Sequence, residues 1–275
     1  MLELIRRSAG VGESHLAGVL FLAGGQAQVK KICEVLAKTK LFESIDHSTF
    51  QPYCARSTIR LFWKGEIVVN EGDRCDGVFT VVSGTLAVQK YAADGEYVTL
   101  NLLEAGDSFG EEFFFGSQRE YTYSVEAVAN AQVIQVPRDA IMIMLDNDEE
   151  LRLNFMRDLS DKLLEQYVRI NTLSQRNLRL KITRYLLELY YENQEDEDRR
   201  YGHMQKKAKE VTPSVELPVS KEVAAKLLAM PRPSFSRELV RMEKEGLIRV
   251  NGRVIWLTNL PALELDGELE ELEGL

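Results

Sequence analysis

The sequence predicts an α+β protein with an antiparallel β domain, then one long helix, then a C-terminal winged helix-turn-helix. Three observations predict this order. Short β-rich runs separated by turn residues fill 57–137, an uninterrupted helical pattern covers 148–173, and two short helical patterns followed by a hairpin pattern lie within 220–257. No segment of helical length separates the β runs, which excludes a parallel βαβ fold.

The β domain is indicated by its turn residues, which recur every 10 to 12 positions. Each β-rich run ends at glycine accompanied by aspartate or serine, the residue types that adopt tight turns most readily. This spacing is typical of an antiparallel barrel or sandwich. A helix is expected before the domain, over 30–41, and strands are expected at 67–69, 78–82, 86–91 and 97–103.

The long helix carries an apolar stripe at spacings of four and three residues, with charged residues on its other faces. At about 26 residues it would be about 39 Å long, more than a small domain needs, and so long a stripe calls for a partner. We therefore expect a parallel two-fold dimer, with packing on its own domain as the alternative. The residues of the seam would be Leu151, Phe155, Leu159, Leu163 and Ile170.

The segments around these elements are expected to be less regular. A second helix is expected over 178–192, and a solvated loop over 193–200, which contains no apolar residue. The acidic segment 263–275 is expected to be a solvated tail. Near the start of the chain, the apolar run 16–23 is too short to span a membrane as a helix, so no membrane association is expected.

The C-terminal module has the start and stop signals of a winged helix. Ser220 can cap a short helix, and Pro231 ends it. Pro233 fits the first turn of the next helix, and Gly246 fits the position just after its end. A hairpin with Asn251-Gly252 at its turn follows, which completes the pattern.

The second helix of this module separates an apolar stripe from an exposed face that bears arginines, as a recognition helix does. Arg237 is expected to read a guanine through two hydrogen bonds, whereas Arg232 and Arg241 would hold phosphates. The DNA-binding residues would be Arg232, Ser234, Ser236, Arg237 and Arg241.

Charge supports this interpretation, because it is unevenly distributed. The formal net charge is −9, yet 175–260 holds 17 Lys and Arg against 12 Asp and Glu, so the rest of the chain carries −14. A basic C-terminal module on an acidic chain suits DNA binding by one domain. Ordinary fluctuation in composition is the alternative explanation.

The sequence lacks the motifs of the enzyme classes that a small β domain would suggest. None of its 3 His lies within 57–137, so a metal-dependent barrel enzyme would lack its ligands. No nucleophile elbow, P-loop or HExxH motif occurs. Cys33, Cys54 and Cys75 form no CxxC, so no iron–sulfur cluster is expected, and reduced thiols are the default. We therefore expect neither an enzyme nor a metal site.

The order of the three parts resembles the cyclic-AMP receptor/fumarate-nitrate regulator (Crp/Fnr) superfamily over roughly residues 35–260. Phe109-Gly110-Glu111 is similar to its phosphate-loop motif, and Ser236-Arg237 with 245–248 is similar to its recognition helix and wing entry. The resemblance implies a β-roll of the cyclic-nucleotide-binding type. Its effector residues would be Gly110, Glu111, Glu112, Tyr121, Thr122, Gln166 and Tyr167.

The sequence departs from the cyclic-nucleotide-binding members of that superfamily at one position. Those members place an Arg, followed by Ser or Thr, beyond the Gly-Glu pair to hold the cyclic phosphate; here the two positions are Tyr121 and Thr122, and Arg119 is two residues out of register. A phenol cannot replace a bidentate guanidinium at an anion, so we expect an effector other than cyclic AMP.

The cofactor remains open at this stage. Haem would need an axial ligand, for which His15, His47 and Cys75 are the candidates, although each is expected to be an ordinary surface or packing residue. The recognition helix also departs from many relatives, because Pro233 stands where they carry Glu one turn before Arg237. The operator sequence is therefore expected to differ from theirs.

We predict a cytoplasmic, homodimeric transcription regulator that binds an inverted-repeat DNA operator under the control of an unidentified small-molecule effector in the roll. RNA polymerase would be a further partner. The alternative is a regulatory module that shares the roll and acts through protein contacts, which gives no reason for the exposed arginines. The predicted parts are an extension (1–34), the β-roll (35–147), the dimerisation helix (148–175), the winged helix (176–262) and the acidic tail (263–275).

Overall fold

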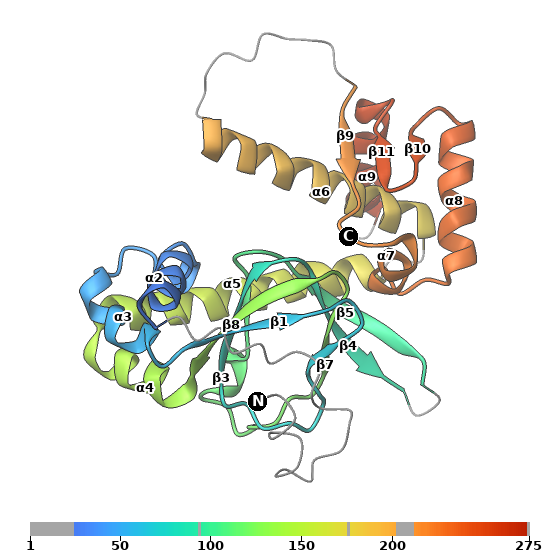
Figure 1. The fold of residues 1–275 in the computed structure, drawn as a ribbon. Helices are drawn as coiled ribbons and strands as arrows, with labels where there is room; N and C mark the ends of the chain where they lie inside the picture. Colours follow the sequence, from blue (N-terminus) through green and yellow to red (C-terminus); the bar gives the residue numbers. More distant parts are fainter. Residues whose placement is uncertain (1–24, 93–94, 175–176, 202–211, 274–275) are drawn as a thin grey trace, which may run out of the picture. The chain divides into compact units, whose positions relative to one another are not determined.

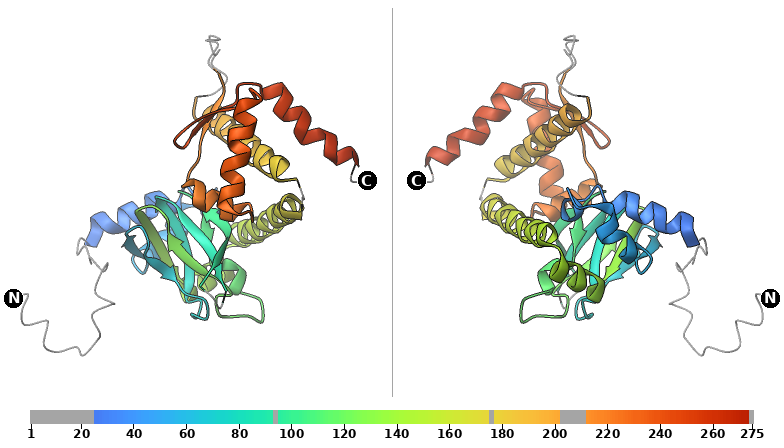
Figure 2. Two further views of the ribbon diagram at one scale, coloured as in Figure 1. Left: turned by 90° about the vertical axis from the view of Figure 1, so that its right-hand side faces the viewer. Right: turned by 90° about the vertical axis from the view of Figure 1, so that its left-hand side faces the viewer.

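The computed structural model describes residues 25–92, 95–174, 177–201 and 212–273, without the side chains of 25–28, 195–201 and 267–273 (Figures 1 and 2). The chain divides into two compact units. The first comprises the described parts of Met1–Leu86 together with Leu103–Asp158, and the second comprises those of Ala87–Leu102 and Leu159–Leu275. None of the described helices combines the length and apolar character that a membrane span requires.

The first unit begins with two helices that pack against each other, α2 (Gly25–Leu36) and α3 (His47–Cys54). A short 3-10 turn, η1 (Lys40–Phe42), connects them. The helix predicted over 30–41 therefore exists, but it starts and ends five residues earlier, since Thr39 donates its hydroxyl to the carbonyl oxygen of Leu36 and turns the chain. Helix α3, whose first turn is capped by the Asp46 carboxylate, was not predicted.

The roll consists of two four-stranded antiparallel sheets, as the turn spacing predicted. Predicted strands 67–69, 86–91 and 97–103 have the observed bounds, and the strand predicted at 78–82 extends by one residue at each end. One sheet has the order β1 (Thr58–Phe62), β8 (Ala131–Pro137), β3 (Gly77–Ser83), β6 (Ser108–Phe109); the other has the order β2 (Ile67–Val69), β7 (Ser124–Ala127), β4 (Leu86–Tyr91), β5 (Tyr97–Leu103).

Helices follow the last strand. The short helix α4 (Arg138–Asn147) packs on β3 and β8, and the long helix α5 (Glu149–Ser174) follows directly. Asp148 caps α5 by accepting a hydrogen bond from the backbone N–H of Leu151 at 2.8 Å. The prediction of one long helix over 148–173 is confirmed, and α5 joins the two units because residue 159 begins the second.

The second unit contains the winged helix. Its elements are α6 (Leu178–Tyr201), β9 (Ser214–Glu216), α7 (Lys221–Leu227), α8 (Arg232–Lys244), β10 (Arg249–Asn251), β11 (Val254–Trp256) and α9 (Leu260–Glu273). The three strands form an antiparallel sheet in the order β10, β11, β9. The predicted helix-turn-helix and hairpin are confirmed.

One prediction in this unit is wrong. The segment 193–200, predicted as a loop, continues α6, because Gln194 and the glutamates and arginines that follow it favour a helix even where no apolar face directs them. The acidic segment at the end of the chain has a regular structure that was not predicted, because residues 263–273 belong to α9. Leu263 is fully buried there, and Tyr191 of α6 donates its hydroxyl to Glu264.

Candidate nucleic-acid interface and effector site

The first helix of the helix-turn-helix begins at a capping serine. Ser220 Oγ accepts a hydrogen bond from the backbone N–H of Val223, as predicted. After α7 the chain turns sharply through Ala229, whose φ of 48° lies in the left-handed region. Arg232 and Pro233 then form the first turn of α8, where proline's missing N–H has no helical partner to lose. This short turn therefore connects α7 to α8 as in a helix-turn-helix.

Helix α8 ends in a Schellman motif. The backbone N–H of Leu247 donates to Met242 O and that of Gly246 to Glu243 O, with Gly246 at a φ of 76°. The motif redirects the chain into β10, and Gly252 turns it into β11. The buried stripe of α8 is the predicted one: Phe235, Leu239 and Met242.

The opposite face of α8 presents the predicted arginines to solvent. Arg237 is exposed, and its guanidinium contacts the hydroxyl of Ser234 at 3.4 Å. In the described part of the chain, no carboxylate lies within 4.0 Å of it. The two carboxylates that could have engaged it have other partners: Glu238 pairs with Arg179, and Glu243 accepts the backbone N–H of Val250. Arg237 therefore carries an unneutralised charge on a helix whose opposite face is fixed.

The two flanking arginines are held by carboxylates instead. Arg232 pairs with Glu222 of α7 at 3.6 Å, and Arg241 pairs with Glu238 at 3.8 Å and Glu245 at 3.5 Å. Both arginine side chains remain more than half exposed, so phosphate oxygens can reach them. Of the two predicted serines, Ser234 contacts Arg237 and Ser236 is half-buried.

Arg179 of α6 holds α8 in place, which the sequence analysis missed. Its Nε donates to Glu238 Oε1 at 2.9 Å, and its two terminal nitrogens donate to the two oxygens of Glu245 at 2.6 and 2.8 Å. The Arg179 hydrogen bonds hold the pKa of Glu245 below its ordinary value. No local pattern could have shown this contact, since it joins residues 66 positions apart.

A ribbon made of β4 and β5 contacts α7 within the second unit. Arg169 of α5 donates from one terminal nitrogen to Thr99 O of the ribbon at 3.1 Å and to Leu227 O of α7 at 3.0 Å. The ammonium of Lys226 lies 3.3 Å from the ring centroid of Tyr97. Two cations thus join the ribbon to the C-terminal turn of α7, where the helix dipole also favours positive charge.

In the roll, the predicted phosphate position is filled by an aromatic side chain. Gly110 has a φ of 101°, and a Cβ placed there would lie 2.8 Å from Gly77 O and 3.0 Å from the Tyr121 hydroxyl oxygen. Tyr121 is 2% exposed, and its ring packs against Phe113 with 5.0 Å between centroids. Burial raises the pKa of Tyr121 far above its ordinary value, so the hydroxyl stays neutral.

The acidic side chains next to Gly110 also disfavour binding of an anion at this position. Glu112 accepts the backbone N–H of Gly110 at 2.9 Å and the hydroxyl of Tyr123. Glu111 is buried and accepts the Ser108 hydroxyl at 3.0 Å. Arg119, the arginine out of register, donates to Phe114 O at 2.6 Å instead of facing Gly110.

The remaining predicted effector residues are exposed. Thr122 lies on the surface of the first unit, whereas Gln166 and Tyr167 are exposed residues of α5 in the second unit. The described contacts thus bring Gly110 and Tyr121 together, with Glu111 and Glu112 beside them. Thr122 follows Tyr121 directly in the first unit, whereas Gln166 and Tyr167 belong to the second unit.

The predicted dimer seam requires a correction. Leu151 and Phe155 are 1% and 3% exposed, because they pack into the core of the first unit and leave no surface for a partner helix. Leu159 is half-buried, and Leu163 and Ile170 are exposed. The exposed apolar residues of α5 lie three, seven, four and three residues apart and centre on the opposite face: Leu153, Met156, Leu163, Tyr167 and Ile170, flanked by Leu164 and Val168.

The haem candidates do not form a shared ligand set. His47 is an exposed residue at the start of α3 whose ring contacts Phe50, and Cys75 is buried beside Gly110. His15 lies outside the described residues. Across the described ranges, no group of three or more His, Cys, Asp or Glu side chains is arranged to hold a metal ion.

Comparison with known families matches both parts of the chain. Residues 59–148 match the cyclic nucleotide-binding domain family, and residues 180–265 match the Crp-like helix-turn-helix domain family. The two matches together cover more than half of the chain. They coincide with the roll and with the winged helix.

Individual regulators align over most of their length. The transcriptional regulator LdrP of Thermus thermophilus is 28% identical over 206 residues, which is 75% of this chain and 95% of that protein. The cAMP-activated global transcriptional regulator Vfr of Pseudomonas aeruginosa is 22% identical over 212 residues, 76% of this chain and 89% of that protein.

A solved structure of a CRP-family transcriptional regulator from Thermus thermophilus superimposes with a TM-score of 0.57 at 27% identity, covering 75% of this chain and 95% of that one. The roll, the long helix and the winged helix therefore have counterparts in solved regulators. With both family matches on one chain and full-length regulators aligned across them, the chain belongs to the cyclic-AMP receptor/fumarate-nitrate regulator (Crp/Fnr) superfamily.

Proposed function

We propose that the chain is a sequence-specific transcription regulator that binds an inverted-repeat operator as a homodimer, in the cytoplasm, under the control of a signal other than cyclic AMP. The observation that carries this proposal is the exposed guanidinium of Arg237 on α8. Arginine in the first half of a recognition helix can reach O6 and N7 of a guanine in the major groove.

The position of α8 supports base reading in particular. Phe235, Leu239 and Met242 fix one face of the helix in the core, and Arg179 holds Glu238 and Glu245 at its side. A side chain that reads bases must be held in register, and this bracing provides a rigid platform for it. Arg232 and Arg241, which lie about one turn to either side, suit phosphate contacts that set the orientation.

The dimer is supported by the apolar face of α5. Leu163, Tyr167 and Ile170 are more than half exposed on a helix whose other face is buried. Steps of three and four residues are the spacing of a two-helix seam. A two-fold pair of winged helices would place its recognition helices on half-sites one helical turn apart, and such an operator is an inverted repeat.

The nature of the signal is supported by the filled position at Gly110. Cyclic AMP carries an anionic phosphate, whereas this position offers the neutral hydroxyl of Tyr121 beside the carboxylate of Glu112. Desolvating a phosphate there, without a cation to pair with, would be strongly unfavourable. We therefore expect this chain to share the fold of its cAMP-activated relative but to respond to a different effector.

The test selects an operator from random duplex DNA with the full chain and then measures its affinity by fluorescence anisotropy across a salt series. A regulator should prefer the selected duplex over random DNA by about 10³-fold or more, and its affinity should fall steeply with salt. A module that acts only through protein contacts would select no sequence and show no salt-dependent binding. That outcome would overturn the proposal.

A further inference from the structure

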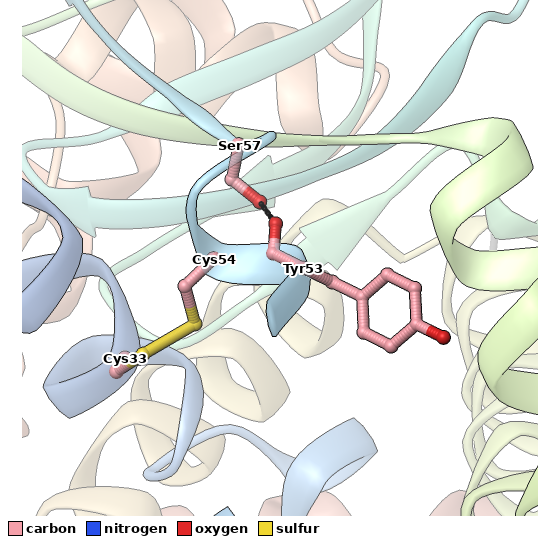
Figure 3. Close-up of a disulfide and its surroundings, with 4 residues drawn as sticks. All are labelled: Cys33, Tyr53, Cys54 and Ser57. Atoms are coloured by element: carbon pink, nitrogen blue, oxygen red, sulfur yellow. Dashed lines mark hydrogen bonds between the residues drawn. A yellow bond between two sulfur atoms is a disulfide. The ribbon is translucent and has the colours of Figure 1, made fainter. Parts of the chain in front are cut away.

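Two of the three cysteines meet in the first unit (Figure 3). Cys33 lies on α2 and Cys54 is the last residue of α3; their Cα atoms are 5.9 Å apart and their sulfurs are bonded. This Cα separation is one that a disulfide spans without backbone movement. The expectation of reduced thiols is therefore wrong for this pair, while Cys75 is a free thiol.

Hydrogen bonds at the end of α3 hold Cys54 in place. The Ser57 hydroxyl donates to Tyr53 O at 3.1 Å, and the Ser57 N–H donates to Cys54 O at 3.2 Å, which fixes the last turn of α3. Figure 3 shows the Tyr53 ring turned away from the sulfurs. Both cysteine side chains are buried, so a reagent reaches them only after local opening.

The bond closes a loop on which α5 rests. Asn154, in the second turn of α5, donates its amide to Leu41 O at 3.3 Å and to Glu43 O at 2.7 Å, and both carbonyls belong to the connection between α2 and α3. The Cys33–Cys54 crosslink encloses that connection. Closing the loop removes alternative conformations of it. The disulfide therefore stabilises the surface to which the first turns of α5 are anchored.

We infer that Cys33 and Cys54 are a reversible redox pair, and that their disulfide strengthens operator binding by fixing the anchor of α5. The inference rests on the proposed function and deepens it, because it supplies a signal for the roll-bearing unit. In a compartment kept reducing by small thiols, a disulfide is usually transient and regulatory. A disulfide that joins α2 to α3 beside the loop that anchors α5 fits a regulatory role.

The chemistry balances with a low-molecular-weight disulfide such as oxidised glutathione as the oxidant. One cysteine thiolate attacks a sulfur of that disulfide, which forms a mixed disulfide and releases one small thiol. The second cysteine thiolate then attacks the protein sulfur of the mixed disulfide and releases the second small thiol. The pair loses two electrons and two protons, and the small disulfide gains them.

The test equilibrates the full chain under argon in buffers of graded reduced-to-oxidised glutathione ratio, quenches with acid and alkylates the free thiols. Peptide mass spectrometry then reports each cysteine. We expect Cys33 and Cys54 to lose their label together, with the linked peptides two hydrogens lighter, while Cys75 stays labelled as an internal control. Operator affinity is measured on the same samples.

The oxidised form should bind the selected operator about 5- to 150-fold more tightly than the reduced form, the usual range of coupling between sites. Cys33→Ser and Cys54→Ser should each bind like the reduced wild-type chain at every ratio. The comparison within the wild-type chain remains decisive should either variant misfold. A pair that never titrates, equal affinity of the two forms, or tighter binding by the reduced form would overturn the inference. If the pair titrates but neither form selects DNA, the proposed function fails instead.

Discussion

Arg237 and Arg241 lie about one turn apart on α8, yet their surroundings differ. Arg237 contacts only the neutral hydroxyl of Ser234 among the described side chains, whereas Arg241 stays within 4.0 Å of Glu238 and Glu245. A guanidinium already paired with carboxylates can still attract a phosphate, but its planar fork is not free for two hydrogen bonds to one base. The partners of the two arginines therefore assign base reading to Arg237 and phosphate contact to Arg241.

Replacing these two arginines should give distinguishable losses. Arg237→Ala should cost about 1–3 kcal/mol on the selected operator and relax the preference at one base pair in each half-site. Arg241→Ala should weaken operator and random DNA alike and flatten the salt dependence by about one unit of slope. Anisotropy titrations on both duplexes measure this. An equal loss on both duplexes for Arg237→Ala would show that Arg237 also binds phosphate.

The position of Tyr121 in the roll leads to a prediction about cyclic AMP binding. Because its buried, neutral ring fills the position beside Gly110, the chain should not bind cyclic AMP with micromolar affinity. Isothermal titration calorimetry checks this, with the cAMP-activated relative from Pseudomonas aeruginosa as the positive control. Tyr121→Ala should lower the free energy of unfolding by about 3–5 kcal/mol, as loss of a buried aromatic ring does. Micromolar cyclic AMP binding by the unmodified chain would contradict the assignment.

At the scale of elements, α8 depends on a neighbour distant in sequence. Arg179 of α6 engages Glu245 through two hydrogen bonds and Glu238 through a third. The side chain of Glu238 is only 14% exposed, so a carboxylate is desolvated there and needs its partner. The orientation of the recognition helix is therefore set jointly by the core stripe and by this ion pair.

This bridge should make the winged helix sensitive to acid. Arg179 lowers the pKa of Glu245 in the folded chain below its ordinary value of 4.5, so the carboxylate's contribution is present above about pH 4.5 and is lost as pH falls through the lower folded pKa. The unfolding free energy of the wild-type chain should fall over that window, and Arg179→Ala should make the decline shallower. Urea unfolding followed by circular dichroism from pH 7 to pH 3 measures both.

The matched control is Arg253→Ala, which removes the exposed pair between Arg253 and Glu216 of the wing sheet. It should leave the acid dependence close to that of the wild-type chain, because surface pairs contribute little. If Arg179→Ala and Arg253→Ala shifted the acid dependence equally, the bridge to α8 would have no special role.

Local patterns predicted the elements where the hydrophobic period and the turn residues agreed. Strands β2, β4 and β5, the start of α7 at Ser220 and the end of α8 at Gly246 all carry such signals. The loop predicted over 193–200 failed, because absence of apolar residues indicates exposure and not absence of a helix. The candidate site likewise has features that the sequence predicted and features that it did not.

Within the candidate site, the faces of α8 could be read from spacing, and so could the mismatch at Tyr121. The Arg179 bridge, the Arg169 contact and the Cys33–Cys54 bond could not, since each joins residues far apart in the chain. The predicted stripe does not stay on one face of α5, for a geometric reason. It steps mostly by four residues, which is more than the 3.6 residues of a helical turn, so it drifts around the helix from the core face at Leu151 to the exposed face at Ile170.

At the scale of the whole molecule, assembly should depend on the corrected seam. Leu163→Glu should place a charge in the apolar interface and shift the mass in light scattering from about twice 31.3 kDa toward 31.3 kDa. Operator affinity should fall on the order of 10²-fold or more, because the second half-site no longer binds intramolecularly. The far-ultraviolet circular dichroism should not change, since Leu163 is exposed in the monomer.

Gln166→Glu is the matched control, as it adds the same charge at an exposed polar residue of α5 and removes no apolar side chain from the seam. It should remain dimeric. Leu151→Glu provides the contrast, because a charge at that buried position should unfold the first unit and not merely separate the subunits. A Leu163→Glu chain that remained dimeric and bound its operator normally would exclude this seam.

The ribbon of β4 and β5 has a consequence for protein engineering. Its strands belong to a sheet of the roll, yet Arg169 and Lys226 attach it to α7 in the second unit. A chimera that joined the roll of one relative to this winged helix between α5 and α6 would bring a foreign ribbon to Lys226 and leave its ammonium without the Tyr97 ring. Exchange of DNA specificity between relatives should therefore transplant residues 87–102 together with the winged helix, so that the boundary of the exchangeable module follows these contacts and not the order of the chain.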